Sequence, residues 1–272
     1  MMPQRRVWYF LSFVCVLTIA FNLQATDDAS QPAYSGGWTN GSNGGNQFLP
    51  WSLVPTGPST NSGFFIGDSN TNAFGTGPGI NSGTGVAWGT YANSSNSSIA
   101  IRPFVTPLTP GNTFGVQIDK GFIDNGSSVG FSLSDSSNSV RFSFRFTGGG
   151  SNYSISDATG TFNTSLGFLG TGLNTALDLV NPTTYLFTVT DISNGNTYQH
   201  VGPLVAGGAI DRFVGFNINA GSGIANEAYF NRMTIAPVPE PASVLLICGL
   251  AGGALTMLRR RRQLRMRAAE SR

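Results

Sequence analysis

The stretch Val140-Arg-Phe-Ser-Phe-Arg-Phe146 decides the fold class of this chain. Apolar residues stand at every second position and Arg or Ser stands between them, which is the period of a strand with one buried face. The alternation predicts a half-buried strand with a positive outer face. Similar short segments occur at residues 114–118, 129–133, 185–190, 198–201, 213–218 and 228–235.

Clusters of Gly, Asn and Ser separate these segments, and no helical period of useful length interrupts them between residues 26 and 236. The dipeptide Asn194-Gly195 predicts a hairpin turn, because both residues tolerate the positive φ angles of a tight turn. Residues 124–126 (Asp-Asn-Gly) join two of the predicted strands. Short strands at this spacing predict an all-β domain, an antiparallel β-sandwich or jelly roll.

Charge is distributed unevenly along the chain. The whole chain has a net charge of +2, but residues 26–236 contain six basic and eleven acidic residues, a net charge of −5. This excludes a broad basic surface for nucleic acid in the central domain. The two cysteines, Cys15 and Cys248, both lie in apolar end segments. The central domain therefore has no disulfide, thiolate metal site or cysteine nucleophile.

The N-terminus has the pattern of a secretory signal peptide over residues 1–25. Arg5 and Arg6 precede an apolar run over residues 7–21, and Leu23-Gln-Ala25 follows as a cleavage site. Thr18-Ile-Ala20 is a second candidate site. An uncleaved membrane anchor is the alternative interpretation of this signal helix.

The C-terminal segment consists of three parts in a fixed order. Pro239-Glu240-Pro241 comes first, then an apolar stretch over residues 242–258, then the basic cluster Arg259, Arg260, Arg261 and Arg262. As a helix the apolar stretch would be about 26 Å long, at the short limit for a bilayer core. The basic cluster would hold its end on the cytoplasmic side. These features predict a transmembrane helix, and a plain single-span anchor is one interpretation of it.

Residues 237–272 resemble the PEP-CTERM sorting signal. The resemblance implies that an exosortase, a membrane-embedded processing enzyme, is a partner and that Pro239, Glu240 and Pro241 are recognition residues rather than catalytic ones. It also implies a localisation: the protein is exported, anchored in the inner membrane through its C-terminus, and released to the cell surface or extracellular space after processing. Association with extracellular polysaccharide is a further expectation for a surface or matrix protein of this kind.

The central region looks like exported bacterial β-sandwich domains with a concanavalin A-like jelly-roll architecture. This resemblance implies a fold and carries no activity. The stretches that carry it are residues 88–92 (Trp-Gly-Thr-Tyr-Ala), 102–104, 129–133, 149–153, 217–221 and 228–231.

Catalytic residue types are scarce in the central domain. A Ser-His-Asp triad would have to use His200, and no G-x-S-x-G motif accompanies it. A glycosidase needs two facing carboxylic acids, but Glu227 is the single Glu of the domain and no acidic cluster surrounds it. The sequence therefore predicts a non-enzymatic surface or matrix protein that uses no cofactor.

A lectin-like carbohydrate-binding module is the alternative function. Trp51, Trp88 and Tyr91 are candidates for stacking against sugar rings, and a place in the core is the competing interpretation. Asp119 and Asp124 are weak candidates for Ca²⁺, because they lie near strand ends among turns rich in oxygen ligands. Asp135 belongs to the same group, but Asp also favours turns for local hydrogen-bonding reasons.

Overall fold

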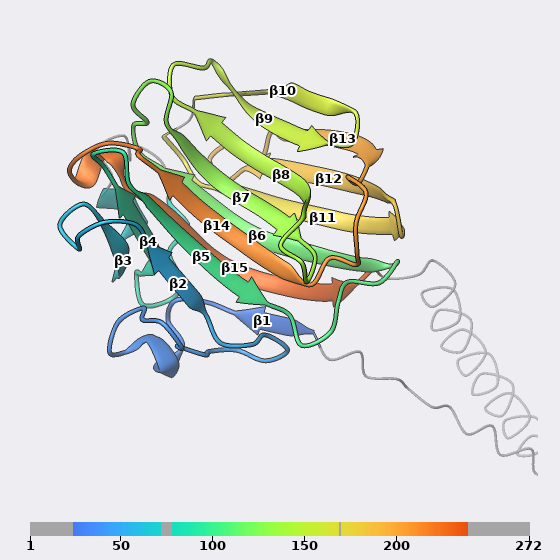
Figure 1. Cartoon of the computed structure of the whole chain (residues 1–272), viewed down its shortest axis with the longest axis horizontal. Coiled ribbons are helices and arrows are strands. Elements are labelled where there is room, and N and C mark those ends of the chain that lie inside the picture. The colour runs from blue at the N-terminus through green and yellow to red at the C-terminus, as the bar shows by residue number, and fades with distance from the viewer. Residues whose placement is uncertain (1–23, 72–77, 169, 239–272) are drawn as a thin grey trace, which may run out of the picture.

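The computed structural model describes residues 24–71, 78–168 and 170–238. Two antiparallel β-sheets pack face to face, as Figure 1 shows, so the prediction of an all-β sandwich is confirmed. The described residues contain no α-helix, only the 3₁₀ turns η1 (Pro32–Tyr34), η2 (Ser69–Thr71) and η3 (Ile224–Asn226). No helix within these ranges is long and apolar enough to cross a membrane. The predicted signal helix and transmembrane helix lie outside the described residues.

The larger sheet has eight strands, in the order β13-β12-β11-β6-β15-β4-β3, with β1 paired to β15 as well. Every pairing in it is antiparallel. Its strands are β1 (Ala25–Asp27), β3 (Ser62–Gly67), β4 (Ala87–Ala92), β6 (Asn112–Lys120), β11 (Leu173–Asn181), β12 (Thr184–Asp191), β13 (Thr197–Pro203) and β15 (Ala228–Pro237).

The smaller sheet has seven strands, in the order β10-β9-β8-β7-β14-β5-β2. The stretch that sets the fold class forms β8 and lies between β7 and β9. The strands of this sheet are β2 (Ser52–Pro55), β5 (Ser97–Pro103), β7 (Ser128–Ser134), β8 (Val140–Thr147), β9 (Asn152–Asp157), β10 (Gly160–Gly167) and β14 (Arg212–Ile218).

The connections show which strand neighbours the local sequence determines. The predicted hairpin is confirmed: β12 pairs with β13, and Gly195 takes a φ of 75° in the turn between them. By contrast, β6 and β7 lie in different sheets, so residues 121–127 cross from one sheet to the other. Gly121 is needed at the start of this crossing, because a Cβ there would lie 1.9 Å from the carbonyl oxygen of Ala225.

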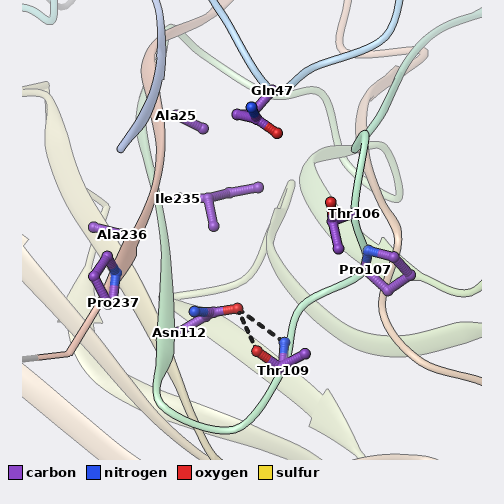
Figure 2. Close-up of a pocket in the computed structure, with 9 residues that line it drawn as sticks. All are labelled: Ala25, Gln47, Thr106, Pro107, Thr109, Asn112, Ile235, Ala236 and Pro237. Atoms are coloured by element: carbon purple, nitrogen blue, oxygen red, sulfur yellow. Dashed lines mark hydrogen bonds between the residues drawn. The ribbon is translucent and has the colours of Figure 1, made fainter. Parts of the chain in front are cut away.

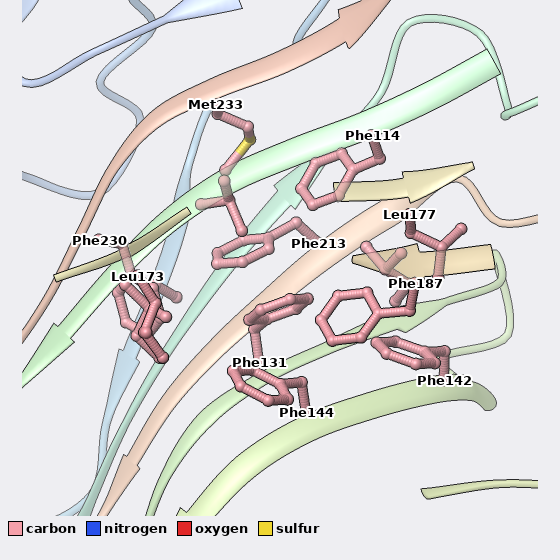
Figure 3. Close-up of a cluster of buried hydrophobic side chains, with 14 of the residues drawn as sticks. Phe114, Phe131, Phe142, Phe144, Leu173, Leu177, Phe187, Phe213, Phe230 and Met233 are labelled. Carbon is pink, nitrogen blue, oxygen red and sulfur yellow. The ribbon is translucent and has the colours of Figure 1, made fainter. Parts of the chain in front are cut away.

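Phenylalanine rings from both sheets meet in the core, as Figure 3 shows. The rings of Phe142 on β8 and Phe187 on β12 have centroids 4.7 Å apart, which joins the two layers. Phe131 and Phe213 lie on neighbouring strands of the smaller sheet, with centroids 5.6 Å apart. All four side chains are fully buried, so the alternation in the sequence becomes the interior of the sandwich.

The alternation assigns Arg141 to an exposed positive face, and the structure corrects this. Arg141 is only 3% exposed, because the loop after β13 folds over it. The amide of Val205 donates to the carbonyl oxygen of Arg141, and Nε of Arg141 donates back to the carbonyl oxygen of Val205. Arg145, two positions further along the same face, is half-buried.

The last strand, β15, carries the chain out of the domain. Its beginning pairs with β4 and its later part with β1, on the same edge, while β6 lies along its other edge. A bulge at residues 231–234 separates the two pairings, and Arg232 takes a φ of 47° there. Because Ala25 lies opposite Ile235, the first and last strands of the domain are direct neighbours.

Candidate functional site

The aromatic residues proposed for sugar stacking lie inside the protein, which corrects that hypothesis for the two tryptophans. Trp51 is 2% exposed and Trp88 is fully buried. Their rings pack edge to face with centroids 5.3 Å apart, and Trp38 packs against Trp51 at 5.0 Å. Tyr91 is half-buried, and its hydroxyl donates to the carbonyl oxygen of Ser59 at 2.6 Å. Buried rings have no free face for a sugar, so these residues stabilise the fold.

A buried ion pair lies against this aromatic cluster and holds the first strand in place. Arg102 donates to Oδ2 of Asp27 at 2.7 Å, and both side chains are fully buried. The hydroxyl of Tyr34 donates to the same oxygen at 2.5 Å and accepts from Nε1 of Trp51 at 2.9 Å. Burial raises the pKa of Asp27 to about 6, against the lowering effect of Tyr34 and Arg102. The group therefore ties residues 25–27 to the core.

His200 belongs to a hydrogen-bonded group that joins the two sheets. Its Nε2 lies 3.3 Å from Oδ2 of Asp157 on β9, and the hydroxyl of Tyr185 donates to that oxygen at 2.8 Å. Burial works to raise the pKa of Asp157, but hydrogen bonds from Thr159, Tyr185 and His200 outweigh it and lower the pKa. In the described part of the chain no serine hydroxyl bonds to His200. The arrangement orients a carboxylate and does not form a nucleophile–base pair.

The acidic residues proposed for Ca²⁺ are not brought together. Asp119 lies on β6 and is 2% exposed, whereas Asp124 lies exposed in the loop between β6 and β7. Asp135 accepts from the backbone amides of Ser137, Ser139 and Gly208, as a turn residue does. Over the ranges that the structure describes, no three His, Cys, Asp or Glu side chains are placed to share a metal ion.

A polar groove that the sequence pattern did not reveal lies on the outer face of the larger sheet. Gln117 on β6 lies opposite Asn174 on β11, and its Nε2 donates to the Asn174 side chain at 2.6 Å. Gln117 is 9% exposed, and its Oε1 has no hydrogen-bond partner among the described residues. The rest of the lining of this groove, whose volume is about 160 Å³, is Gly115, Val116, Thr175, Arg232 and Thr234.

The side chains that line the groove offer both hydrogen-bond donors and acceptors. Oε1 of Gln117 is a hydrogen-bond acceptor without a donor, and burying an unpaired acceptor lowers the stability of a protein. The side chains of Asn174 and Thr234 can both donate and accept, as sugar hydroxyls can. Strand alternation alone shows that Gln117 faces away from the core. Only the pairing of β6 with β11 and β15 shows which polar side chains lie beside it.

The end of the sandwich at which β15 finishes is called here the tail end. It consists of the loops 104–111, 182–183 and 204–211, which join strands at that end, together with Val238. The amide of Val238 donates to the carbonyl oxygen of Gly111 at 2.6 Å, so the last described residue is fixed to the first of these loops. Asp211 is the one charged residue among them.

Two pockets open at the tail end. Figure 2 shows the smaller one, of about 180 Å³, between Ala25 and Ile235 on one side and Thr106 and Pro107 on the other. Asn112 closes it, accepting from both the amide and the hydroxyl of Thr109 at 2.9 Å. The larger pocket, of about 680 Å³, has mostly apolar walls and Arg141 in its lining. Its apolar lining is Leu108, Pro110, Ala158, Leu179, Pro182, Leu204, Ala206, Ala209 and Ile210.

Pro239, Glu240, Pro241 and the basic cluster over residues 259–262 lie outside the described residues, as do residues 1–23 of the signal peptide. The structure places only their attachment points. Residue 24 leads directly into β1, and Val238 directly follows β15. Because β1 and β15 are paired, both attachment points lie at the tail end.

No family model matches the chain, and no curated protein matches it. Solved structures resemble it in fold. A protein of unknown function from Shewanella oneidensis MR-1 is 14% identical over 80% of this chain and 88% of its own, with a TM-score of 0.48. A carbohydrate esterase from the Shiga toxin-encoding bacteriophage phi24B is 11% identical over 70% and 90%, with a TM-score of 0.44. The globular domain of T. cruzi calreticulin is 11% identical over 77% and 94%, also with a TM-score of 0.44. Likeness at this level carries no argument about activity.

Proposed function

We propose that this chain is an exported, non-catalytic surface protein of the bacterial envelope that is anchored and sorted through its C-terminal segment. The observation that supports this proposal is the position of the C-terminal segment relative to the folded domain. The folded domain continues to Val238, and the predicted recognition tripeptide follows at once. Processing at this tripeptide would release the whole sandwich, because every described strand lies before it. The neighbouring positions of β1 and β15 let both ends of the domain face the membrane during export.

The mature C-terminus of the protein tests this proposal. Mass spectrometry of the protein from fractionated cells should find a chain that ends near residues 239–241, outside the inner membrane. Glu240→Ala should leave the tail intact and the protein in the inner membrane. Glu270→Ala is the matched control, because it removes the other acidic residue of the segment and leaves the tripeptide unchanged. An intact tail in the unaltered protein, still in the inner membrane, would count against processing.

Lectin-like binding of a neutral glycan is the second candidate function, and the groove beside Gln117 favours it. The groove presents an unpaired acceptor, and Arg232 is the one charged residue of its lining. Extracellular polysaccharide is the ligand class that we propose for it. Binding on a glycan array should be lost in Gln117→Leu and kept in Gln199→Leu, which alters an exposed glutamine on β13. Binding that survives Gln117→Leu, or that requires Ca²⁺, would reject this groove as the site.

A further inference from the structure

The tail end of the sandwich combines three properties that are independent of one another. Its three loops, residues 104–111, 182–183 and 204–211, contain one charged residue, Asp211. They and the adjoining strand ends expose apolar side chains: Val105 is 52% exposed and Val180 is 57% exposed. The larger of the two pockets, whose walls are mostly apolar, opens between the same loops.

Charged groups next to this end have partners within the protein. Asp211 and Arg212 form an ion pair at 2.8 Å. Asp135 accepts from backbone amides, and Arg141 is buried beneath the loop after β13. Asp178 is half-buried and accepts from the hydroxyl of Thr113.

The opposite end of the sandwich also exposes apolar side chains, such as Ile218 at 43% and Ile224 at 60%, beside the exposed carboxylate of Asp124. The features that distinguish the tail end are its larger apolar pocket and the two chain ends that leave it.

The chain itself limits how far the tail end can lie from a membrane. Four residues lead from Val238 to Ala242, where the apolar segment begins, and they span at most about 14 Å when fully extended. The headgroup layer on each side of a bilayer core takes up roughly 5–8 Å. If residues 242–258 span the bilayer, at most about 6–9 Å lies between Val238 and the headgroup layer.

We propose that the tail end is a membrane-contact surface, and that its occupant is the phospholipid surface into which the C-terminal segment inserts. Val105 and Val180 enter the interfacial layer, where apolar side chains without charged neighbours are favoured. The larger pocket opens toward lipid. This inference rests on the anchorage described under the proposed function. It adds that the sandwich stands on the bilayer in a defined orientation and does not swing freely on a linker.

Site-specific labelling of the full chain tests the orientation. The chain carries Cys15→Ser and Cys248→Ser and is reconstituted into vesicles of phosphatidylethanolamine and phosphatidylglycerol that contain nitroxide-labelled lipid. A fluorophore is attached at Val105→Cys or Val180→Cys. Ile224→Cys and Ile218→Cys are the matched controls, because these apolar residues are also exposed but lie at the opposite end of the sandwich. Quenching at residues 105 and 180 should exceed that at residues 218 and 224 at least twofold.

Flotation of the same vesicles separates the two proposals. Protein that does not float with the vesicles overturns the anchorage and the contact surface together. Protein that floats but shows equal quenching at all four positions overturns the contact surface alone. Adding Val105→Glu to the chain labelled at residue 180 should halve the quenching there, since a carboxylate opposes insertion. Ile218→Glu should leave that quenching unchanged, and an equal loss in both variants would also overturn the contact surface.

Discussion

Replacing Lys120 with methionine should stabilise the sandwich at neutral pH. Lys120 lies on β6, faces the core and is 1% exposed, and its Nζ has no hydrogen-bond partner among the described residues. The ammonium lies 4.1 Å from the ring centroid of Phe146 and 3.5 Å from that of Phe168. Burial lowers the pKa of Lys120 from its usual 10.5 to about 7, although the charge of Asp119 acts to raise it.

The size of the effect follows from this pKa. One pKa unit corresponds to about 1.4 kcal/mol, so the shift from 10.5 to about 7 corresponds to roughly 5 kcal/mol. Cation–π contacts with the two rings favour the ammonium, each by about 2 kcal/mol when desolvated, and offset much of this cost. We therefore expect Lys120→Met to raise the free energy of unfolding by about 1–3 kcal/mol at pH 7, because methionine keeps the length and removes the charge.

The pH dependence gives the sharper test. The folded-state pKa lies below the unfolded one, so between about pH 7 and 10 the unfolded chain binds more protons than the folded chain. The unaltered protein should therefore gain stability as the pH rises through this window, by up to about 1.4 kcal/mol per pH unit. The Lys120→Met variant should not gain stability in this window, so the excess of its free energy of unfolding over that of the unaltered protein should shrink from pH 7 to pH 9.

Urea unfolding of residues 24–238, followed by tryptophan fluorescence at several pH values, measures the difference. This segment contains every described strand and no cysteine, so alkaline pH causes no thiol chemistry. Arg232→Met, which removes an exposed cation from β15 of the same sheet and keeps Lys120, should show the same pH dependence as the unaltered protein. A Lys120→Met protein that is less stable at pH 7, with a deficit that is constant from pH 7 to 9, would refute the reasoning.

Three other changes test the parts of the fold that position the chain ends. Arg102→Met should destabilise the sandwich by about 3–5 kcal/mol in urea unfolding, because it leaves the carboxylate of Asp27 buried without its cation. Asp27→Asn tests the pKa of that carboxyl, which is raised to about 6. Because the folded state binds this proton more tightly than the unfolded state, the contribution of Asp27 to stability falls as the pH rises from about 4 to 6. The stability of the Asp27→Asn protein should not fall in this way. Asn231→Ala should lower the free energy of unfolding by about 3 kcal/mol, since the Asn231 side chain accepts from the amide of Ala29 and donates to two carbonyl oxygens of the loop beside β4. A loss below about 1 kcal/mol would show that the bulge forms without these hydrogen bonds.

Sequence reasoning failed where long-range contacts decide exposure. Trp51 and Trp88 are of the residue type that stacks against sugar rings, but both are buried. The segment before β3 folds over them and packs Trp38 and Tyr34 against them. Asp119 and Asp124 are close in sequence but differ in exposure, since the chain leaves the larger sheet between them. The groove at Gln117 depends on strands 57 and about 115 residues away, so no local pattern predicts it.

The sequence by itself determined the strands. Alternation over residues 140–146 placed Phe142, Phe144 and Phe146 in the core, and Asn194-Gly195 identified the hairpin, because side-chain direction and turn geometry are local properties of the backbone. Only the tertiary structure decided which strands are neighbours and which outward-facing residues are covered. Arg141 shows the difference: its outward position follows from the period of two, but its burial follows from a loop more than sixty residues later. The same non-local pairing brought β1 beside β15, and so placed both ends of the domain at one end of the sandwich.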